Sequence, residues 1–399
     1  MIINKIRTLQ LKAFPRVLWV ELQTDTGLVG LGETMPKPGA SRVMLHETLS
    51  SFLLGQDPLQ IEWIWNNIFR AINTHGWAGT EIRTLSAIDI ALWDIFGQYT
   101  NQPIYQLLGG KVRDNIKVYN TCAGADQAVW LKDAGRLAQE LLADGVDVMK
   151  LWPFDVFSRP PYLGHYLTPE DIDTGLDTIR QIKGAVGERM RIAVDGHGRY
   201  HLPTAKMLAR ALQPFDILWY EDMTMNENAP ALRELKEASG SISLAVSERL
   251  FTRRQMRDVL ERQACDLVIA DPSWMGGITE TRKLANMAET YELPFAPHNC
   301  GGPVLHLVCT ALSAHLPNLW LMETVRSFYN GWFKEVITGL PEIRDGFSAL
   351  PEGPGLGARL RPEVWQREDA TVDVTELGQK RDPEALVYIQ SGYGIPWRH

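Results

Sequence analysis

The chain has 399 residues, enough for one large domain with an accessory domain or for two to three ordinary domains. Its apolar content of 45% is typical of a globular protein. The 40 Lys and Arg residues and 48 Asp and Glu residues give a net charge of −8, which argues against nucleic acids and acidic membranes as partners.

The N-terminal sequence does not resemble a secretory signal, because Lys5 and Arg7 interrupt its apolar stretch. No apolar run approaches the length that spans a membrane. The four cysteines are scattered and include no C-x-x-C pair, so we expect no disulfide framework. These features favour a cytoplasmic location.

The first third of the chain mixes strand and helix patterns. Residues 17–33 predict two strands around a turn at 25–27, and helical patterns follow through 40–70 and 80–97. The segment 103–112 closes this region, so we predict an N-terminal domain over 1–114.

Beyond residue 115, short apolar strand candidates alternate with amphipathic helices. This alternation indicates parallel βαβ units, and eight strands predict a closed (β/α) barrel over 115–360. An open doubly wound sheet is the alternative, although no G-x-G-x-x-G motif supports a dinucleotide-binding version. The remaining tail, 361–399, is expected to pack on the N-terminal domain. The eight candidate strands are 116–120, 146–152, 192–195, 217–221, 243–248, 266–271, 294–298 and 319–323.

Six successive strand candidates, from the third to the eighth, end in an acid or a histidine. In a parallel barrel these ends meet at the C-terminal face, where active sites lie. Any one such acid is more often the N-cap of the next helix, but that explanation fails for six strands in succession. The residues, separated by 23 to 27 positions, are Asp195, Glu221, Glu248, Asp271, His298 and Glu323.

Three carboxylates from adjacent strand ends, Asp195, Glu221 and Glu248, predict a site for a hard divalent cation. Mg²⁺ prefers such oxygen ligands, whereas Zn²⁺ favours cysteine and histidine. The alternative is a buried acid cluster neutralised by arginines such as Arg199 and Arg249, which would be costly without a catalytic use.

The next two strand ends carry Asp271 and His298. A carboxylate on one ring nitrogen fixes the imidazole tautomer and leaves the other nitrogen to accept a proton. A histidine taken alone is more often a loop residue, but the aspartate on the preceding strand end favours a general base.

At this point the chain resembles the enolase superfamily, in its mandelate racemase-like branch. The resemblance covers nearly the whole length and rests on several motifs in the family's order. They are "SAIDIALWDIFGQYTNQPIYQLLGG" (86–110), "VDGH", "YED", "SER", "ADPSWMGGITE", "PHN" and "ME".

The resemblance implies a modified (β/α)₇β barrel with an α+β capping domain formed by the N-terminal region and the C-terminal tail. It also implies Mg²⁺ on the three carboxylates, an Asp271–His298 dyad as base, and a small-molecule carboxylate substrate that loses the proton next to its carboxylate. Glu323 would hydrogen-bond that carboxylate as the protonated acid, which requires a raised pKa. A homo-oligomer, a dimer or an octamer, is expected.

The second strand departs from many relatives. They carry Lys-x-Lys there, whereas this chain has Lys150, Leu151 and Trp152. Tryptophan cannot exchange a proton at neutral pH, so the base on the face opposite His298 is missing. This loss argues against a racemase or epimerase of a 2-hydroxy acid, which needs two bases. Lys150 either hydrogen-bonds the reacting substrate or extends its stem from the strand end.

His197 lies two residues after Asp195 and, if the strand pleat persists, points to the same face. The pattern D-x-H-x-R resembles sugar-acid dehydratases of the galactonate and mannonate type, in which this histidine is the general acid. The resemblance therefore implies dehydration of an aldonate to a 2-keto-3-deoxy acid. The alternative for His197 is a partner that only orients a metal ligand.

Several features stay without an assigned role. The long loop 153–173 is of the kind that carries specificity, and Arg199 is expected to pair with a carboxylate or with substrate. His201 fits a surface histidine before a helix start. A metal-stabilised ligand-binding protein without catalysis also remains possible, although the complete set of acids and histidines argues against it.

Overall fold

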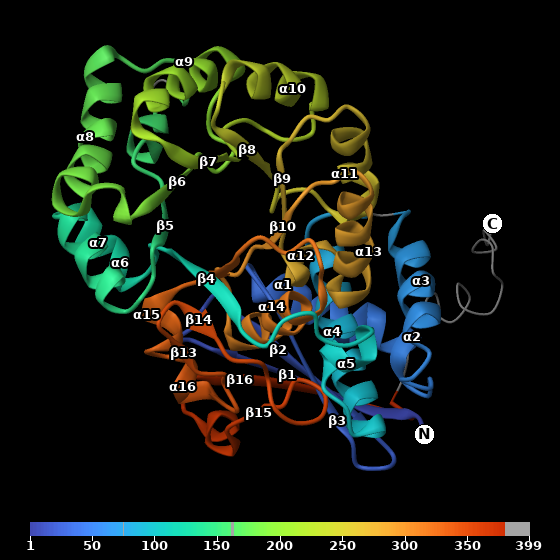
Figure 1. The fold of residues 1–399 in the computed structure, drawn as a ribbon. Coiled ribbons are helices and arrows are strands. Elements are labelled where there is room, and N and C mark those ends of the chain that lie inside the picture. Colours follow the sequence, from blue (N-terminus) through green and yellow to red (C-terminus); the bar gives the residue numbers. More distant parts are fainter. Residues whose placement is uncertain (75, 161–162, 380–399) are drawn as a thin grey trace.

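The structure is a computed structural model that describes residues 1–74, 76–160 and 163–379. Figure 1 shows a ring of strands with helices around its outside and a second unit, built from both ends of the described chain, packed against one side. Within these described ranges, no helix is both long enough and apolar enough to cross a lipid bilayer.

The ring is a barrel of parallel strands. Strands β4 to β10 pair in chain order, β11 pairs with β4, and a bridge between Phe295 and Leu319 joins β10 to the segment before β11. The predicted barrel is therefore confirmed, and the open doubly wound sheet is wrong. The strands are β4 (Ile116–Thr121), β5 (Val148–Leu151), β6 (Arg191–Asp195), β7 (Ile217–Glu221), β8 (Ser243–Val246), β9 (Leu267–Ala270), β10 (Phe295–Pro297) and β11 (Met322–Thr324).

Helices connect each barrel strand to the next and cover the outside of the ring (Figure 1). Their periodic apolar faces are buried, for example Leu137 and Leu141 on α7, which explains why the 3.6-residue pattern predicts them. The connecting helices are α6 (Ala125–Trp130), α7 (Ala134–Ala143), α8 (Pro169–Val186), α9 (Leu202–Leu212), α10 (Ala229–Ala238), α11 (Thr252–Glu261), α12 (Pro272–Met275), α13 (Gly277–Thr290) and α14 (Pro303–His315).

Side chains fill the barrel interior. A separate buried cluster takes residues from the strands around the ring, including Ala193, Ala245 and Ala296. Tyr119 and Trp219 meet edge to face inside it, with ring centroids 5.0 Å apart. The indole of Trp219 donates to Glu221 Oε2 over 2.8 Å, so this apolar plug forms the floor below the strand ends.

The second unit, which we call the cap, is built on a four-stranded antiparallel sheet in the order β16-β1-β2-β3. Its strands are β1 (Ile3–Leu11), β2 (Leu18–Thr24), β3 (Val29–Thr34) and β16 (Ala370–Glu376). The predicted turn at 25–27 is confirmed. β16 brings the described part of the tail onto β1, whereas residues 380–399 lie outside the described ranges.

The cap helices differ from the sequence prediction in one place. The helical pattern predicted through 40–70 is interrupted, because Leu54 is extended and Gly55 has a φ of 86° before Pro58. The elements here are α1 (Pro38–Val43), a π-helical turn (Met44–Leu49), α2 (Ser50–Leu53), α3 (Ile61–Ile72), α4 (Thr80–Thr100) and α5 (Ile104–Leu108).

Helix α4 lies between the cap sheet and the barrel. It packs so tightly on β3 that a Cβ on Gly32 would meet the carbonyl oxygen of Ala87 at 1.9 Å. On the barrel side, α4 contacts α12 and α13.

Three buried carboxylates of the cap, Glu33, Asp89 and Asp94, lie along this boundary, and we call them the seam carboxylates. Each accepts backbone N–H groups from the barrel side or from the segment that follows the barrel.

The segment after the barrel runs along the outside of the molecule before it reaches β16 (Figure 1). It contains only short elements. They are α15 (Arg326–Tyr329), α16 (Phe333–Val336), β12 (Ile337–Thr338), β13 (Ile343–Arg344), β14 (Phe347–Ser348) and β15 (Arg359–Leu360).

Candidate active site

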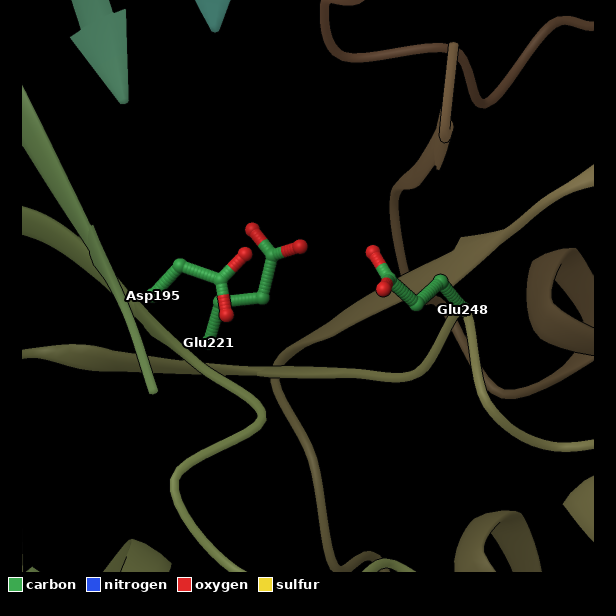
Figure 2. Close-up of side chains that lie close together, drawn as sticks. All are labelled: Asp195, Glu221 and Glu248. Atoms are coloured by element: carbon green, nitrogen blue, oxygen red, sulfur yellow. The ribbon is translucent and has the colours of Figure 1, made fainter. Parts of the chain in front are cut away.

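The C-terminal ends of the barrel strands bring the predicted metal ligands together. Asp195 ends β6, Glu221 ends β7, and Glu248 follows β8 by two residues. Figure 2 shows Asp195 and Glu221 side by side, with the Glu248 carboxylate reaching toward them from the other side. One oxygen from each carboxylate lies within 4.8 Å of the others, and all three side chains are buried.

This arrangement fits a hard divalent cation, because every donor is a carboxylate oxygen. Of the two arginines considered as neutralising partners, Arg199 binds Asp155 instead, whereas Arg249 lies 3.7 Å from Glu248. A closer cation is Lys150 on β5, whose Nζ lies 2.7 Å from Glu221 Oε1 and 3.5 Å from Asp195 Oδ2.

Negative charge exceeds positive charge inside this cluster. Burial raises the pKa of Glu221 to about 7; Lys150 opposes the rise, and the neighbouring carboxylates of Asp195 and Glu323 add to it. Burial disfavours the ammonium of Lys150, but Glu221 and Glu323 outweigh it and raise the Lys150 pKa well above its ordinary value. Lys150 is therefore a permanent cation at the site.

Asp271 and His298 form the predicted dyad. His298 Nδ1 lies 2.8 Å from Asp271 Oδ2, and its Nε2 lies 2.9 Å from Glu248 Oε2. Asp271 also caps helix α12, since its Oδ1 accepts from the Ser273 N–H. Asp271 is thus both a helix cap, through Oδ1, and a histidine partner, through Oδ2.

A second histidine–carboxylate pair lies on the other side of the cluster. His197 Nδ1 is 2.8 Å from Asp155 Oδ2, and His197 Nε2 is 3.5 Å from Asp195 Oδ2. Burial opposes the charge of His197, but Asp195 and Asp155 overcome it and raise the pKa to about 9. Asp155 was missed by the sequence analysis, because an acid in a long loop gives no signal without its spatial partner.

The expected route that brings His197 to the site is wrong. The strand pleat does not persist, because β6 stops at Asp195 and His197 adopts a left-handed backbone with φ 49°. A tight turn presents the ring instead, and Asp195 Oδ1 accepts the His197 N–H over 2.8 Å. Trp152 packs edge to face on the imidazole, with ring centroids 5.3 Å apart.

Glu323 is at the site but not in the expected protonation state. Burial raises its pKa, but Lys150 and His298, with hydrogen bonds from Thr121 and the Asn299 N–H, leave the pKa lowered. Lys150 Nζ lies 3.0 Å from Glu323 Oε1. The prediction of a protonated acid is therefore wrong for this arrangement, in which Glu323 is a carboxylate that holds Lys150.

A cavity of about 720 Å³ opens above these groups, between the barrel and the cap. Its barrel side includes Lys150, His197 and His298, and its cap side includes Arg16 and Arg83. Arg83 could not be found from the sequence, because an arginine within a helical pattern is usually a solvated surface residue.

The remaining expectations concern the loops beside the cavity. Arg199 pairs with a carboxylate as expected, since its Nε lies 2.9 Å from Asp155 Oδ2. His201 is exposed before α9, where its ring stacks on His165 with centroids 3.5 Å apart. Asp155 comes from the 153–173 loop and reaches the site.

Two family models match the chain. Residues 8–109 match the mandelate racemase / muconate lactonizing enzyme N-terminal domain, and residues 133–364 match the enolase C-terminal domain-like model. The chain belongs to the enolase superfamily. The resemblance found in the strand-end motifs is thereby confirmed, together with its fold.

Individual relatives agree with this family assignment. A D-xylonate dehydratase from Haloferax volcanii is 32% identical over 353 residues, which cover 87% of this chain and 84% of that protein. An enolase of the mandelate racemase subgroup from Agrobacterium tumefaciens has a TM-score of 0.87 at 37% identity, covering 94% of this chain and 99% of the other. An enolase protein from Sargasso Sea environmental sequencing gives 0.88 at 34% identity, with the same coverage.

Proposed function

We propose that this superfamily member dehydrates a sugar acid, an aldonate, to a 2-keto-3-deoxy acid. The observation that carries the proposal is the pair of histidine–carboxylate dyads, His298–Asp271 and His197–Asp155, on either side of the carboxylate cluster. Dehydration needs one group to remove a proton and another to protonate the leaving hydroxyl. The D-xylonate dehydratase relative supports the same class of reaction.

Asp195, Glu221 and Glu248 would hold a divalent cation, for which we propose Mg²⁺. When bound, Mg²⁺ would stabilise the negative charge that develops on the substrate carboxylate as the neighbouring C–H bond breaks. Lys150, fixed between Glu221 and Glu323, adds a permanent positive charge beside that position.

His298 takes the proton from C2 of the aldonate. Asp271 accepts the Nδ1–H, which leaves Nε2, 2.9 Å from Glu248 Oε2 in this structure, as the atom that would take the proton. His197 is the proton donor at C3, because its Nδ1–H is given to Asp155 and its Nε2 is directed toward the cluster. The C2–H and C3–O bonds break, water leaves, and the enol product becomes the 2-keto-3-deoxy acid.

Trp152 supports dehydration over racemisation. Its indole lines the cavity and packs on His197, at the strand end where relatives of the racemase type carry a second lysine. A racemase requires a base on each face of the reacting carbon, and this indole supplies none.

The test incubates the purified protein with Mg²⁺ and a panel of C5 and C6 aldonates and measures keto-acid formation. We expect keto-acid formation from at least one aldonate. When the reaction runs in D₂O, the recovered substrate should contain no molecules that are inverted and deuterated at C2. Recovered substrate with inverted configuration and deuterium at C2, without keto acid, would show a racemase instead.

A further inference from the structure

The roof of the cavity carries an arginine close to the proposed base. Arg83, on α4 of the cap, places its guanidinium 4.1 Å from the ring centroid of Trp274. The Trp274 ring lies in turn 5.1 Å from the imidazole of His298. One aromatic ring therefore separates the guanidinium from the group that we expect to abstract the proton.

Arg83 has no carboxylate partner among the described residues. One of its five N–H donors goes to the Met35 carbonyl, and the guanidinium carbon lies over the Trp274 ring. Two other partly buried arginines of this chain have carboxylate partners. Arg253 binds Glu280, and Arg326 binds Asp126 and Glu140.

Partial burial of a cation without a counter-ion costs free energy and lowers the pKa of the group. Burial lowers the pKa of Arg83 to about 10, although Asp271 and Glu248 oppose the change. Arg83 nevertheless stays charged at neutral pH.

A second arginine adds to the positive charge on this side of the cavity. Arg16, in the segment between β1 and β2, lines the same cavity and adds to the lowering of the Arg83 pKa. Arg249 is different, since it lies 3.8 Å from Asp222 and 3.7 Å from Glu248 and so has anionic neighbours. The positive charge that lacks a partner is thus on the cap side of the cavity.

We propose that Arg83, assisted by Arg16, binds an anionic group at the end of the substrate remote from the reacting carboxylate. The inference rests on the proposed function, which places the reacting carboxylate at the cluster below, beside Lys150. The remote group is a second carboxylate, as in an aldarate, or a phosphate ester on the terminal hydroxyl of an aldonate. Both are anions that a guanidinium edge binds through two parallel hydrogen bonds.

The experiment compares substrates that differ only at the remote end. D-Xylonate, xylarate and 5-phospho-D-xylonate form one set, and gluconate, glucarate and 6-phosphogluconate form another. We expect kcat/KM for an aldarate or a phosphoaldonate to exceed that of the matching aldonate by about tenfold or more, chiefly through KM. Comparison of the aldarate with the phosphoaldonate distinguishes a carboxylate from a phosphate as the remote group.

Arg83→Gln should abolish this preference by raising KM for the aldarate or phosphoaldonate, with little change in KM for the aldonate. Arg83→Lys, which keeps the charge but loses the two-pronged geometry, should fall between Arg83→Gln and the wild type. The matched control is Arg254→Gln, because Arg254 also lies over an aromatic ring, Phe69 at 4.6 Å, but does not line the cavity.

Calorimetric titration of the Mg²⁺-loaded protein with xylarate and glucarate gives a readout that does not require turnover. Tighter binding of these dianions than of xylonate and gluconate, lost in Arg83→Gln, would support the inference even if no substrate reacts. The inference would be overturned if aldonates bound and reacted as well as aldarates and phosphoaldonates, and if Arg83→Gln affected all of them equally. That result would leave the proposed dehydration intact. Absence of turnover with all sugar acids would instead count against the proposed function.

Discussion

The molecule contains two sets of buried carboxylates that burial affects alike but that have different partners. At the barrel mouth, Asp195, Glu221 and Glu248 face one another. At the boundary with the cap, the seam carboxylate Glu33 accepts the N–H groups of Gly302, Val304 and Leu305, which begin α14. Burial is the largest cause that raises the pKa of both Glu221 and Glu33 to about 7.

The difference in partners separates a structural carboxylate from one available for chemistry. Backbone N–H groups at a helix start are fixed in place and cannot be exchanged for a ligand. The partners at the barrel mouth are side chains, the Lys150 ammonium and the His298 imidazole, which unlike a backbone N–H group can give way to a ligand. A high pKa therefore does not identify an active site in this chain, whereas the kind of partner does.

The largest expected effect on activity comes from a substitution at the barrel mouth. His298→Asn removes the proposed base, and we expect kcat to fall by about 10²- to 10⁴-fold, the usual contribution of general base catalysis. Keto-acid formation under saturating Mg²⁺ and substrate measures the loss. The matched change in the seam, Glu33→Gln, should leave kcat close to the wild-type value. Comparable losses of kcat in the two variants would contradict the distinction between the regions.

The second prediction concerns the cation. Mg²⁺ should raise the unfolding temperature of the wild type, because a ligand at 100 times its Kd stabilises the folded state by about 2.7 kcal/mol. Glu221→Gln should lose most of this shift, since it removes one of three charged ligands. Asp89→Asn, a seam variant, should keep the shift even if its own stability is lower. Calorimetry with and without EDTA provides the measurement.

The third prediction tests Asp155, the loop carboxylate that binds His197. Asp155→Asn should slow dehydration by about 10- to 100-fold, a part of the general acid contribution. Removal of the C2 proton by His298 should continue, so recovered substrate should gain deuterium at C2 in D₂O. A 3-deoxy-3-fluoro aldonate, whose fluoride leaves without a proton donor, should restore most of the rate.

Asp173→Asn is the control for this variant. Asp173 follows the same loop and pairs with Arg180 at the surface. A role of Asp155 in folding alone would slow C2 exchange and elimination together, and the fluoro substrate would then rescue neither.

The sequence predicts the barrel and most of the mouth because both depend on short-range patterns. Each strand is a short apolar run, and a parallel barrel puts every strand end on one face, so position along the chain locates Glu221 and His298. Asp155 and Arg83 could not be found this way. The first lies in a loop, the second lies on a cap helix, and only the folded chain brings them to the cavity.

The same reasoning explains the other differences. Leu54–Gly55 breaks a helix that periodicity alone extends, because Gly55 takes a positive φ. The protonation state of Glu323 depends on Lys150 and His298, which come from other strands, so the strand-end position alone does not determine it. The seam carboxylates were not predicted, since a buried acid on a strand or helix gives no signal until its N–H partners are placed.

The last prediction concerns the stability of the seam and its dependence on pH. The pKa of Glu33 rises from 4.5 in the unfolded chain to about 7 in the folded protein, so between these values the folded state binds more protons. Stability should therefore fall as pH rises through this window, by at most about 3.5 kcal/mol from this group, at about 1.4 kcal/mol for each pKa unit. Glu33→Gln lacks this titration. In urea unfolding, the wild type should thus lose stability relative to Glu33→Gln between pH 5 and pH 8. A difference that stays constant over that range would mean that the three backbone N–H groups hold Glu33 ionised, and the seam would then be a charged helix cap rather than a proton-binding contact.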